Sequence, residues 1–296
     1  MRPRLKWLSV AVMAIALIGV DVSARQTKPA QPPKSVRLYV FDCGVINVNR
    51  AGTERYKVTP EEVGETRFSV PCFLVAHPKG TLMWDLGILP DETVEARARG
   101  EQGNPTATSA AVTTVPRTLA SQLAEIGYRP TDITYFAFSH AHTDHNANAN
   151  LFAKSTWLAR PAERAFMWEE GNTRVNRTFF ENIKSSKSIS LDKDEYDVFG
   201  DASVILKAAP GHSPGHQVMV LNLPKTGRIM IAGDLYHYPQ ERTLHRPPPD
   251  TEANVQQSAA SRVMIEEYLK KTKTEIWISH DFVANAKLKK SPAYYE

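Results

Sequence analysis

Three histidines and one aspartate stand within six residues of this sequence, directly after the apolar run ITYFAF. The segment SHAHTDHNANAN carries His140, His142, Asp144 and His145. His140 and His142 are separated by one residue, so in extended or tightly turned backbone both imidazoles can point the same way and bind one metal ion. Burying these side chains together without a partner would be costly. The segment therefore predicts a metal site at the end of a strand.

Three later segments place the same residue types after apolar runs. APGHSPGHQ offers His212 and His216 on a turn rich in glycine and proline, whereas Asp234 in IAGDLYHY and His280 in IWISHDF follow strand-like runs directly. A lone histidine at a strand end is more often a satisfied polar residue than a ligand. Four such segments in one chain favour ligands that converge from distant parts of the sequence.

The order of these residues resembles that of the metallo-β-lactamase-fold hydrolases, in which H-x-H-x-D-H precedes a histidine, an aspartate and a histidine on successive strand ends. The resemblance covers the chain from about Val36 to His280. It implies one metal ion held by His140, His142 and His212, a second held by Asp144, His145 and His280, and Asp234 as the bridge between them. His216 would then orient its turn from behind the ligands.

Within this family, LYVFDCG, VPCFLVAHPKGTLMWDLG and PGHSPGHQ resemble the branch of N-acyl homoserine lactone lactonases. In that branch a tyrosine three residues after the bridging aspartate assists at the substrate carbonyl. The corresponding residue here is His237, between Tyr236 and Tyr238. A neighbouring tyrosine could reach the carbonyl, His237 could donate instead, or the ester could differ. The three rings are equally consistent with an aromatic edge that covers the site.

The implied chemistry is the opening of a lactone or related ester, with N-acyl homoserine lactones as the expected small-molecule substrates. Two divalent ions about 3.5 to 4 Å apart lower the pKa of a shared water, and we expect the bridging hydroxide to attack the carbonyl. Asp144 is expected to carry the proton, and Tyr236 or His237 to contact the substrate. Ligands without thiolate favour two zinc ions, although iron, manganese or cobalt also accept these donors.

Three other functions share part of this pattern. A secreted metallo-β-lactamase would suit an exported chain, but subclasses of that activity lack an aspartate at the position of Asp234. A thioester hydrolase resembling glyoxalase II has the same ligands, yet it needs a basic glutathione pocket for which the sequence shows no clear cluster. A metal-stabilised binding protein would not need an ion pair with an open bridging position. GHSPG is not the nucleophile elbow of a serine hydrolase.

The elements that must position these residues follow from the strand-like and helical runs. VRLYVFDCG, RFSVPCFLVAHP and TLMWDLG predict an antiparallel meander. Later strands are expected at residues 133–139, 156–159, 202–210, 217–223, 228–234 and 275–279, and helices at 116–127, 161–170 and 253–271. Two halves of similar element order predict an α/β fold, an αββα sandwich of two mixed β-sheets flanked by helices.

Two regions are candidates for the acyl-chain wall of the site. The stretch from Leu89 to Thr114 is polar, with little periodicity, and is expected to be a flexible excursion. Phe166, Met167 and Trp168 in the helix at 161–170 form an apolar group that could line the site. An apolar stripe at helical spacing is usually packing, so the core is an equally good place for these three side chains.

The N-terminus carries the pattern of a secretory signal peptide. Three basic residues precede the 14-residue apolar run WLSVAVMAIALIGV, and the small residues that follow end at Ala24. The run is short for the roughly 20 residues that span a bilayer, although an uncleaved anchor is the alternative. We expect a signal peptide at 1–24, a Pro-rich tether at 25–34 and a hydrolase domain at 35–296, exported to the periplasm or secreted, with no membrane association after cleavage.

Composition and charge are those of a globular enzyme. With 296 residues and 42% hydrophobic content the chain can bury a full core. The formal net charge of +4 falls to +2 once residues 1–24 are removed, and this gives no concentrated basic face for nucleic acid. Cys43 and Cys72 lie in the first two predicted strands, where they could form a disulfide in an exported protein or pack as buried thiols.

Overall fold

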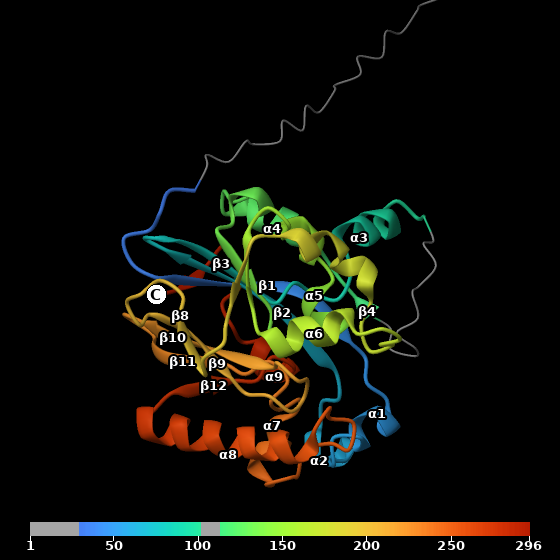
Figure 1. The fold of residues 1–296 in the computed structure, drawn as a ribbon. Coiled ribbons are helices and arrows are strands. Elements are labelled where there is room, and N and C mark those ends of the chain that lie inside the picture. Colours follow the sequence, from blue (N-terminus) through green and yellow to red (C-terminus); the bar gives the residue numbers. More distant parts are fainter. Residues whose placement is uncertain (1–29, 102–112) are drawn as a thin grey trace, which may run out of the picture.

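Two β-sheets lie face to face between layers of helices (Figure 1). The computed structural model describes residues 30–101 and 113–296. The predicted signal peptide lies outside these residues, as do residues 25–29 of the predicted tether. Within the described ranges, none of the helices combines the length and the hydropathy needed to cross a bilayer.

The larger sheet contains eight of the described strands. They are β1 (Arg37–Ile46), β2 (Phe68–His77), β3 (Gly80–Trp84), β4 (Thr113–Thr114), β5 (Tyr135–Ala137), β6 (Thr156–Ala159), β7 (Ser188–Ser190) and β13 (Tyr294–Tyr295). Their order is β13-β1-β2-β3-β5-β6-β7, with β4 beside β1. The β1 to β3 meander is antiparallel, as predicted, whereas β3, β5, β6 and β7 run parallel.

The smaller sheet has the order β12-β11-β10-β9-β8 among the described strands. Its members are β8 (Glu195–Asp197), β9 (Val204–Ala208), β10 (Gln217–Leu223), β11 (Gly227–Ile231) and β12 (Glu275–Trp277). β12 pairs parallel with β11 and the other pairs are antiparallel. Both sheets are therefore mixed, which confirms the predicted αββα sandwich.

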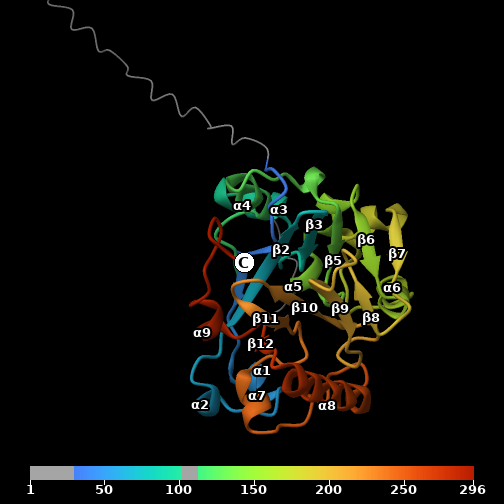
Figure 2. The ribbon, with the colours of Figure 1, turned by 90° about the vertical axis from the view of Figure 1, so that its left-hand side faces the viewer.

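Helices cover the outer faces of the two sheets (Figure 2). The larger sheet is covered by α3 (Asp91–Ala98), α4 (Leu119–Glu125) and α6 (Pro161–Trp168), and the smaller sheet by α8 (Val255–Thr272). The shorter helices are α1 (Arg50–Glu54), α2 (Pro60–Val63), α5 (Thr143–Asn146), α7 (Pro239–Thr243) and α9 (Phe282–Asn285). Four 3-10 segments lie at Pro130–Asp132, Ala149–Phe152, Arg177–Phe179 and Glu181–Ser185.

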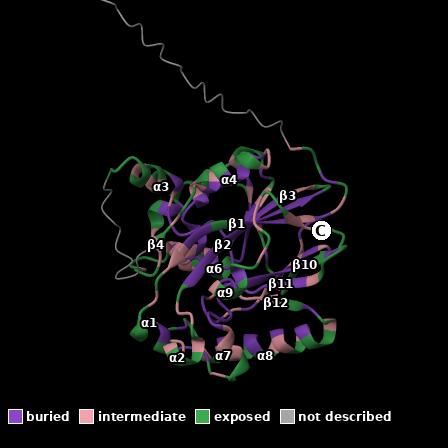
Figure 3. Ribbon diagram, turned by 180° about the vertical axis from the view of Figure 1, so that it is seen from behind, coloured by how far each residue is buried: buried purple, intermediate pink, exposed green. Residues whose placement is uncertain are grey.

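Alternating apolar residues of β10 explain why the sheets stack. Val218 and Val220 pack with α8, whereas Met219 and Leu221 lie in the cluster between the two sheets. A strand exposes successive side chains to opposite faces, so a strand that is apolar throughout must be covered on both sides. Figure 3 shows the result, with buried strands in the interior and an exposed outer side on α8.

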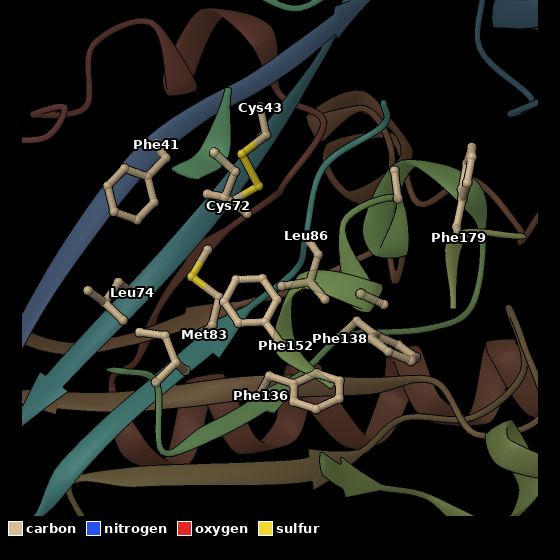
Figure 4. Packing of buried hydrophobic residues seen from close by; sticks show 14 of the residues in the cluster. Phe41, Cys43, Cys72, Leu74, Met83, Leu86, Phe136, Phe138, Phe152 and Phe179 are labelled. Atoms are coloured by element: carbon tan, nitrogen blue, oxygen red, sulfur yellow. A yellow bond between two sulfur atoms is a disulfide. The ribbon is translucent and has the colours of Figure 1, made fainter. Parts of the chain in front are cut away.

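Cys43 and Cys72 form a disulfide between β1 and β2 (Figure 4). Their Cα atoms are 5.8 Å apart, because the two strands are antiparallel neighbours. Both residues are buried in the cluster between the larger sheet and its helices, together with Phe41, Leu74 and Met83. The two alternatives left open by the sequence are thus resolved in favour of pairing.

The stretch from Leu89 to Thr114 is partly regular, which corrects the expected excursion. Residues 91–98 form α3, and the Asp91 carboxylate accepts hydrogen bonds from the amides of Leu119 at 2.7 Å and Ala120 at 2.8 Å. The side chain thus pairs the free backbone N–H groups in the first turn of α4. Asp91 and Leu119 are 28 residues apart, so hydrophobic periodicity could not predict this contact. Residues 102–112 of the stretch lie outside the described residues.

The apolar group of α6, Phe166 to Trp168, belongs to the core. Met167 is fully buried, and Phe166 and Trp168 pack against the same hydrophobic cluster. None of the three lines the cavity that contains the predicted ligands. Of the two alternatives for this group, the structure supports packing.

Candidate metal centre

The seven predicted ligands lie together at one end of the sandwich. The loop after β5 carries His140 and His142, and Asp144 and His145 stand in α5 immediately beyond it. His212 follows β9, Asp234 follows β11 and His280 follows β12. Because the ends of these strands meet at the same edge, side chains up to 140 positions apart in sequence become neighbours.

The first ligand group consists of three imidazoles and one carboxylate. His140 Nε2 lies 2.9 Å from His142 Nδ1 and 3.1 Å from His212 Nε2, and the last two nitrogens are 3.0 Å apart. A neutral imidazole has one N–H, which can point to one acceptor, so lone pairs must face one another in this triangle. A cation among the three nitrogens satisfies all of them.

The second ligand group lies on the other side of Asp234. Asp234 Oδ1 is 3.1 Å from His145 Nε2 and 3.2 Å from His280 Nε2, while Oδ2 is 3.3 Å from His212 Nε2 in the first group. Asp144 Oδ2 completes the second group at 3.5 Å from His280 Nε2. The two oxygens of one carboxylate thus face two different groups, which is the placement that a bridging ligand requires.

Two buried atoms of the predicted ligands have no hydrogen-bond partner among the described residues. They are His145 Nε2 and Asp234 Oδ1, which are near each other but not aligned for a hydrogen bond. Buried polar atoms are rarely left unsatisfied unless an ion or water pairs with them. The donor set, all imidazole nitrogen and carboxylate oxygen, fits divalent ions such as zinc.

Burial sets the protonation of the first group. It lowers the pKa of His140, of His212 and of His142, the last to about 3. These imidazoles are therefore neutral near pH 7, and each has a lone pair available for a metal ion.

Carboxylates dominate the second group. Burial alone would lower the pKa of His145 and His280, but Asp234 and the neighbouring carboxylates outweigh it and raise both. Burial would raise the pKa of Asp234, yet the surrounding imidazoles, His280 first, hold it well below its usual value. The negative charge that attracts these protons would equally attract a divalent cation.

Buried groups hold the imidazoles from behind. His212 Nδ1 lies 3.3 Å from Glu252 Oε1, His145 Nδ1 lies 3.1 Å from Asp85 Oδ2, and His280 Nδ1 lies 2.9 Å from the carbonyl oxygen of Ser69. Such partners fix the tautomer and the ring orientation of metal ligands. Asp85 stands at the end of the predicted strand TLMWDLG, whereas nothing in the sequence pointed to Glu252 or Ser69.

His216 supports Asp234 rather than joining either group. The amide of Asp234 donates to His216 Nε2 at 3.0 Å, so Nδ1 carries the proton and donates to the carbonyl of Ala209 at 2.9 Å. The His216 imidazole thereby fixes the backbone of Asp234, which lies between the two ligand groups. This geometry agrees with the expectation that His216 acts from behind the ligands.

Glu163 of α6 joins two ligand-bearing loops. Its Oε1 accepts from the amide of Ala141 at 2.6 Å, and its Oε2 accepts from the Ser213 hydroxyl at 2.6 Å and the Gly215 amide at 2.8 Å. A Cβ atom on Gly215 would lie 2.5 Å from the Glu163 nitrogen, so glycine allows this approach. One buried carboxylate thus sets the spacing of the His140 and His212 loops.

The three rings after Asp234 point in different directions. His237 Nε2 lies 3.1 Å from Asp234 Oδ2, and Glu241 holds its backbone by accepting from the His237 amide at 2.7 Å. The Tyr236 hydroxyl instead donates to Glu266 of α8 at 3.2 Å, and the Tyr238 hydroxyl donates to the carbonyl of Thr66 at 2.7 Å. Tyr236, a predicted substrate contact, is therefore not brought to the site, because its ring belongs to the core beneath α8.

A cavity of about 510 Å³ opens onto the two ligand groups. Beyond the ligands, its lining includes Ile46, Val48, Asn49, Arg55, Tyr56, Phe68, Arg174 and Thr251. A cavity of about 600 Å³ near α9 contains none of the predicted ligands, so we assign the site to the smaller one. Sequence reasoning missed Arg55, Tyr56 and Arg174, which stand in no recognisable motif.

The sequence pattern of the metallo-beta-lactamase superfamily matches residues 66–272. The chain belongs to this superfamily, and the prediction of a metallo-β-lactamase-fold hydrolase is confirmed.

Relatives of this chain include N-acyl homoserine lactonases. The protein called AttM from Azorhizobium caulinodans is 26% identical over 266 residues, which cover 88% of this chain and 99% of the relative. An N-acyl homoserine lactonase of Bacillus cereus is 23% identical, over 87% and 98% of the two chains.

Solved structures with the same fold include two lactonases with product bound. An N-acyl homoserine lactone hydrolase with N-hexanoyl-L-homoserine at its catalytic metal centre has a TM-score of 0.70 and 22% identity, covering 88% of this chain and 99% of its own. The dizinc quorum-quenching lactonase AidC has a TM-score of 0.61 and 17% identity, over 91% and 96% of the chains.

Proposed function

We propose that this chain is a dinuclear metal hydrolase that opens lactones, with N-acyl homoserine lactones as its substrates. The observation that carries the proposal is the position of Asp234, whose two oxygens face two separate groups of imidazoles. A structural metal site is closed and needs one ion. A shared carboxylate between two ligand groups, open to a cavity, is an arrangement for catalysis.

The residues divide into two ligand sets with one bridge. His140, His142 and His212 would hold one ion, Asp144, His145 and His280 the other, and Asp234 both. When bound, two divalent ions supply a nucleophilic water near neutral pH and polarise the ester carbonyl. Zinc is the proposed metal, because neither group contains a thiolate and the fold neighbour AidC is a dizinc enzyme.

Asp144 and His237 are the proposed acid–base and substrate-contacting groups. Asp144 lies at the cavity wall and is less deeply buried than His145 and His280, so its carboxylate can take up the proton that the attacking water loses and pass it to the departing alkoxide. His237 lies beside Asp234 and also lines the cavity; its Nδ1 atom has no hydrogen-bond partner among the described residues and lies 3.8 Å from Glu241 Oε1.

We also propose that the protein acts outside the cytoplasm. The N-terminal pattern is that of a signal peptide, and the disulfide between Cys43 and Cys72 suits an oxidising compartment. Fractionation of cells that produce the full chain, with N-terminal sequencing of the mature protein, tests the proposed cleavage after Ala24. A cytoplasmic protein that retains residues 1–24 would contradict it.

The decisive experiment combines metal analysis with a substrate panel. Protein purified without chelator should contain about two equivalents of divalent metal, and ring opening of N-hexanoyl homoserine lactone should release one proton per turnover, which a pH-stat records. Nitrocefin and a glutathione thioester serve as competing substrates. Preferred turnover of either competitor, or one equivalent of metal in a fully active enzyme, would contradict the proposal.

A further inference from the structure

Tyr56 occupies the cavity wall beside His237. It follows α1, far from every ligand in the sequence, and its ring centroid lies 4.0 Å from that of His237. Phe68 and Tyr238 contact the same ring at centroid distances of 5.5 and 5.8 Å. A ring packed against three others has a fixed orientation, so its hydroxyl occupies a defined position.

The Tyr56 hydroxyl differs from those of Tyr236 and Tyr238. Each of the latter donates a hydrogen bond to a protein acceptor, whereas the Tyr56 hydroxyl has no partner among the described residues. A phenol that is mostly enclosed usually pairs its O–H. Tyr56 lines the cavity, where a ligand could accept a hydrogen bond from its hydroxyl.

Tyr56 lines the same cavity as Asp144 and Asp234. Burial raises the pKa of Tyr56 well above its ordinary value, and the charges of Asp234 and Asp144 raise it further. The O–H therefore stays protonated throughout the neutral range and can act as a donor. A substrate bound in this cavity could accept its hydrogen bond.

We infer that the Tyr56 hydroxyl donates a hydrogen bond to an oxygen of the bound lactone. The inference rests on the proposed function. It adds a substrate contact from the segment after α1, which carries none of the predicted ligands. Tyr56 packs directly on His237 and both residues line the cavity, so the two rings form one substrate-facing surface.

The contribution expected of this donor is limited by its partial exposure. Removing one preorganised donor to a developing oxyanion costs about 10² to 10³-fold in turnover when the site is closed to water. This cavity is open, so we expect Tyr56→Phe to lower kcat about 10- to 100-fold, with KM changed less than threefold. Tyr56→Phe keeps the ring contacts and removes the O–H alone.

The test compares Tyr56→Phe with Tyr238→Phe in the metal-loaded enzyme. Both variants lose one phenol oxygen, but the Tyr238 hydroxyl is engaged with Thr66 and should leave kcat unchanged. Metal content checks that each variant retains its ions. Calorimetric binding of the opened product, N-hexanoyl homoserine, gives a second measurement, and its affinity should fall about 3- to 10-fold in Tyr56→Phe alone.

Two results would overturn the inference, and they can be told apart. If the wild-type enzyme opens the lactone and Tyr56→Phe matches it in both kcat and product affinity, the hydroxyl has no contact with substrate and the proposed function stands. If the metal-loaded wild-type enzyme does not open the lactone, the proposed function and this inference both fall.

Discussion

The two walls of the cavity are built in different ways. The ligand wall consists of the seven predicted ligands. The substrate wall consists of the cavity-lining residues Asn47, Val48, Asn49, Gly52, Arg55, Tyr56, Arg174 and Thr251. On the ligand wall, most imidazoles have a buried partner behind them. On the substrate wall, Arg55 is exposed without a side-chain partner among the described residues, and Arg174 bonds to the Thr251 carbonyl alone.

This difference indicates that the ligand wall determines the chemistry, whereas the substrate wall selects the substrate. Ligands that are oriented from behind have little freedom, so their geometry is set before metal or substrate binds. Arg55 and Arg174 on the substrate wall have few contacts to lose, and loops of this kind change readily without harm to the fold. Substitutions on the ligand wall should therefore act through metal binding, and those on the substrate wall through contacts with the substrate or the product.

The largest effect is expected from Asp234→Ala on the ligand wall. The substitution removes the carboxylate that faces both groups and leaves the surrounding imidazoles without their counter-charge. Metal content should fall below two equivalents and lactone turnover below detection, as measured by metal analysis and by pH-stat. Tyr238→Phe serves as a folded control near the cavity. Two retained equivalents with substantial turnover would disprove the bridging role.

The next largest effect concerns stability, beneath the substrate wall. β1 leads directly into residues 47–56, and the Cys43–Cys72 disulfide joins it to β2. Replacing both cysteines by serine should lower the free energy of unfolding by about 2 to 4 kcal/mol, as estimated for a bridge that closes a loop of this size. Chemical denaturation measures it. The metal centre should be unaffected, so a loss of bound metal in the folded variant would contradict the separation of the two walls.

The ligand wall could be predicted because its signals are local. His140 to His145 form one short motif, and His212, Asp234 and His280 each follow an apolar run closely. The order of these residues resembles that of the metallo-β-lactamase-fold hydrolases, and this resemblance supplied their division into two groups. The supporting side chains lack such a signal, because Glu163 and Glu252 meet their partners only through tertiary packing.

The substrate wall and parts of the fold needed the structure. Tyr56 and His237 are in contact although 181 positions separate them in sequence. Disulfide pairing depended on strand order, which hydrophobic patterns do not give. Helix α3 is polar with no apolar stripe, and its position depends on the contacts of Asp91 with α4 rather than on periodicity.

A smaller effect on the ligand wall is expected from Glu163→Gln. The Glu163 carboxylate accepts hydrogen bonds from the backbone N–H groups of Ala141 and Gly215. In the glutamine variant, the side-chain NH₂ group must face one of these two donors, and that hydrogen bond is lost. The unfolding free energy should fall by about 1 to 3 kcal/mol, and metal affinity by about 10- to 100-fold, as when a supporting residue is lost. Thermal unfolding and competition with a chelator measure the two quantities. The exposed Glu170→Gln is the matched control, and equal behaviour of the two variants would contradict the role of Glu163.

The smallest effect is expected from Arg55→Ala on the substrate wall. Its exposed guanidinium has no ion pair among the described residues, so the unfolding free energy should change by less than about 0.5 kcal/mol. Ring opening creates a carboxylate, and a cation on the cavity wall attracts that product more than the neutral lactone. Product inhibition should therefore weaken about threefold at low salt and less at high salt, where ions screen the charge.

Arg50→Ala is the matched control for this measurement. Arg50 is the first residue of α1, which ends just before Arg55, and it pairs with Glu54 and Glu61 outside the cavity, so its loss should leave product inhibition unchanged. The comparison between the walls predicts that Arg55→Ala keeps two equivalents of metal. A fall in metal content, or equal inhibition constants for the two variants, would show that the walls are coupled and that Arg55 acts through the fold rather than on the ligand.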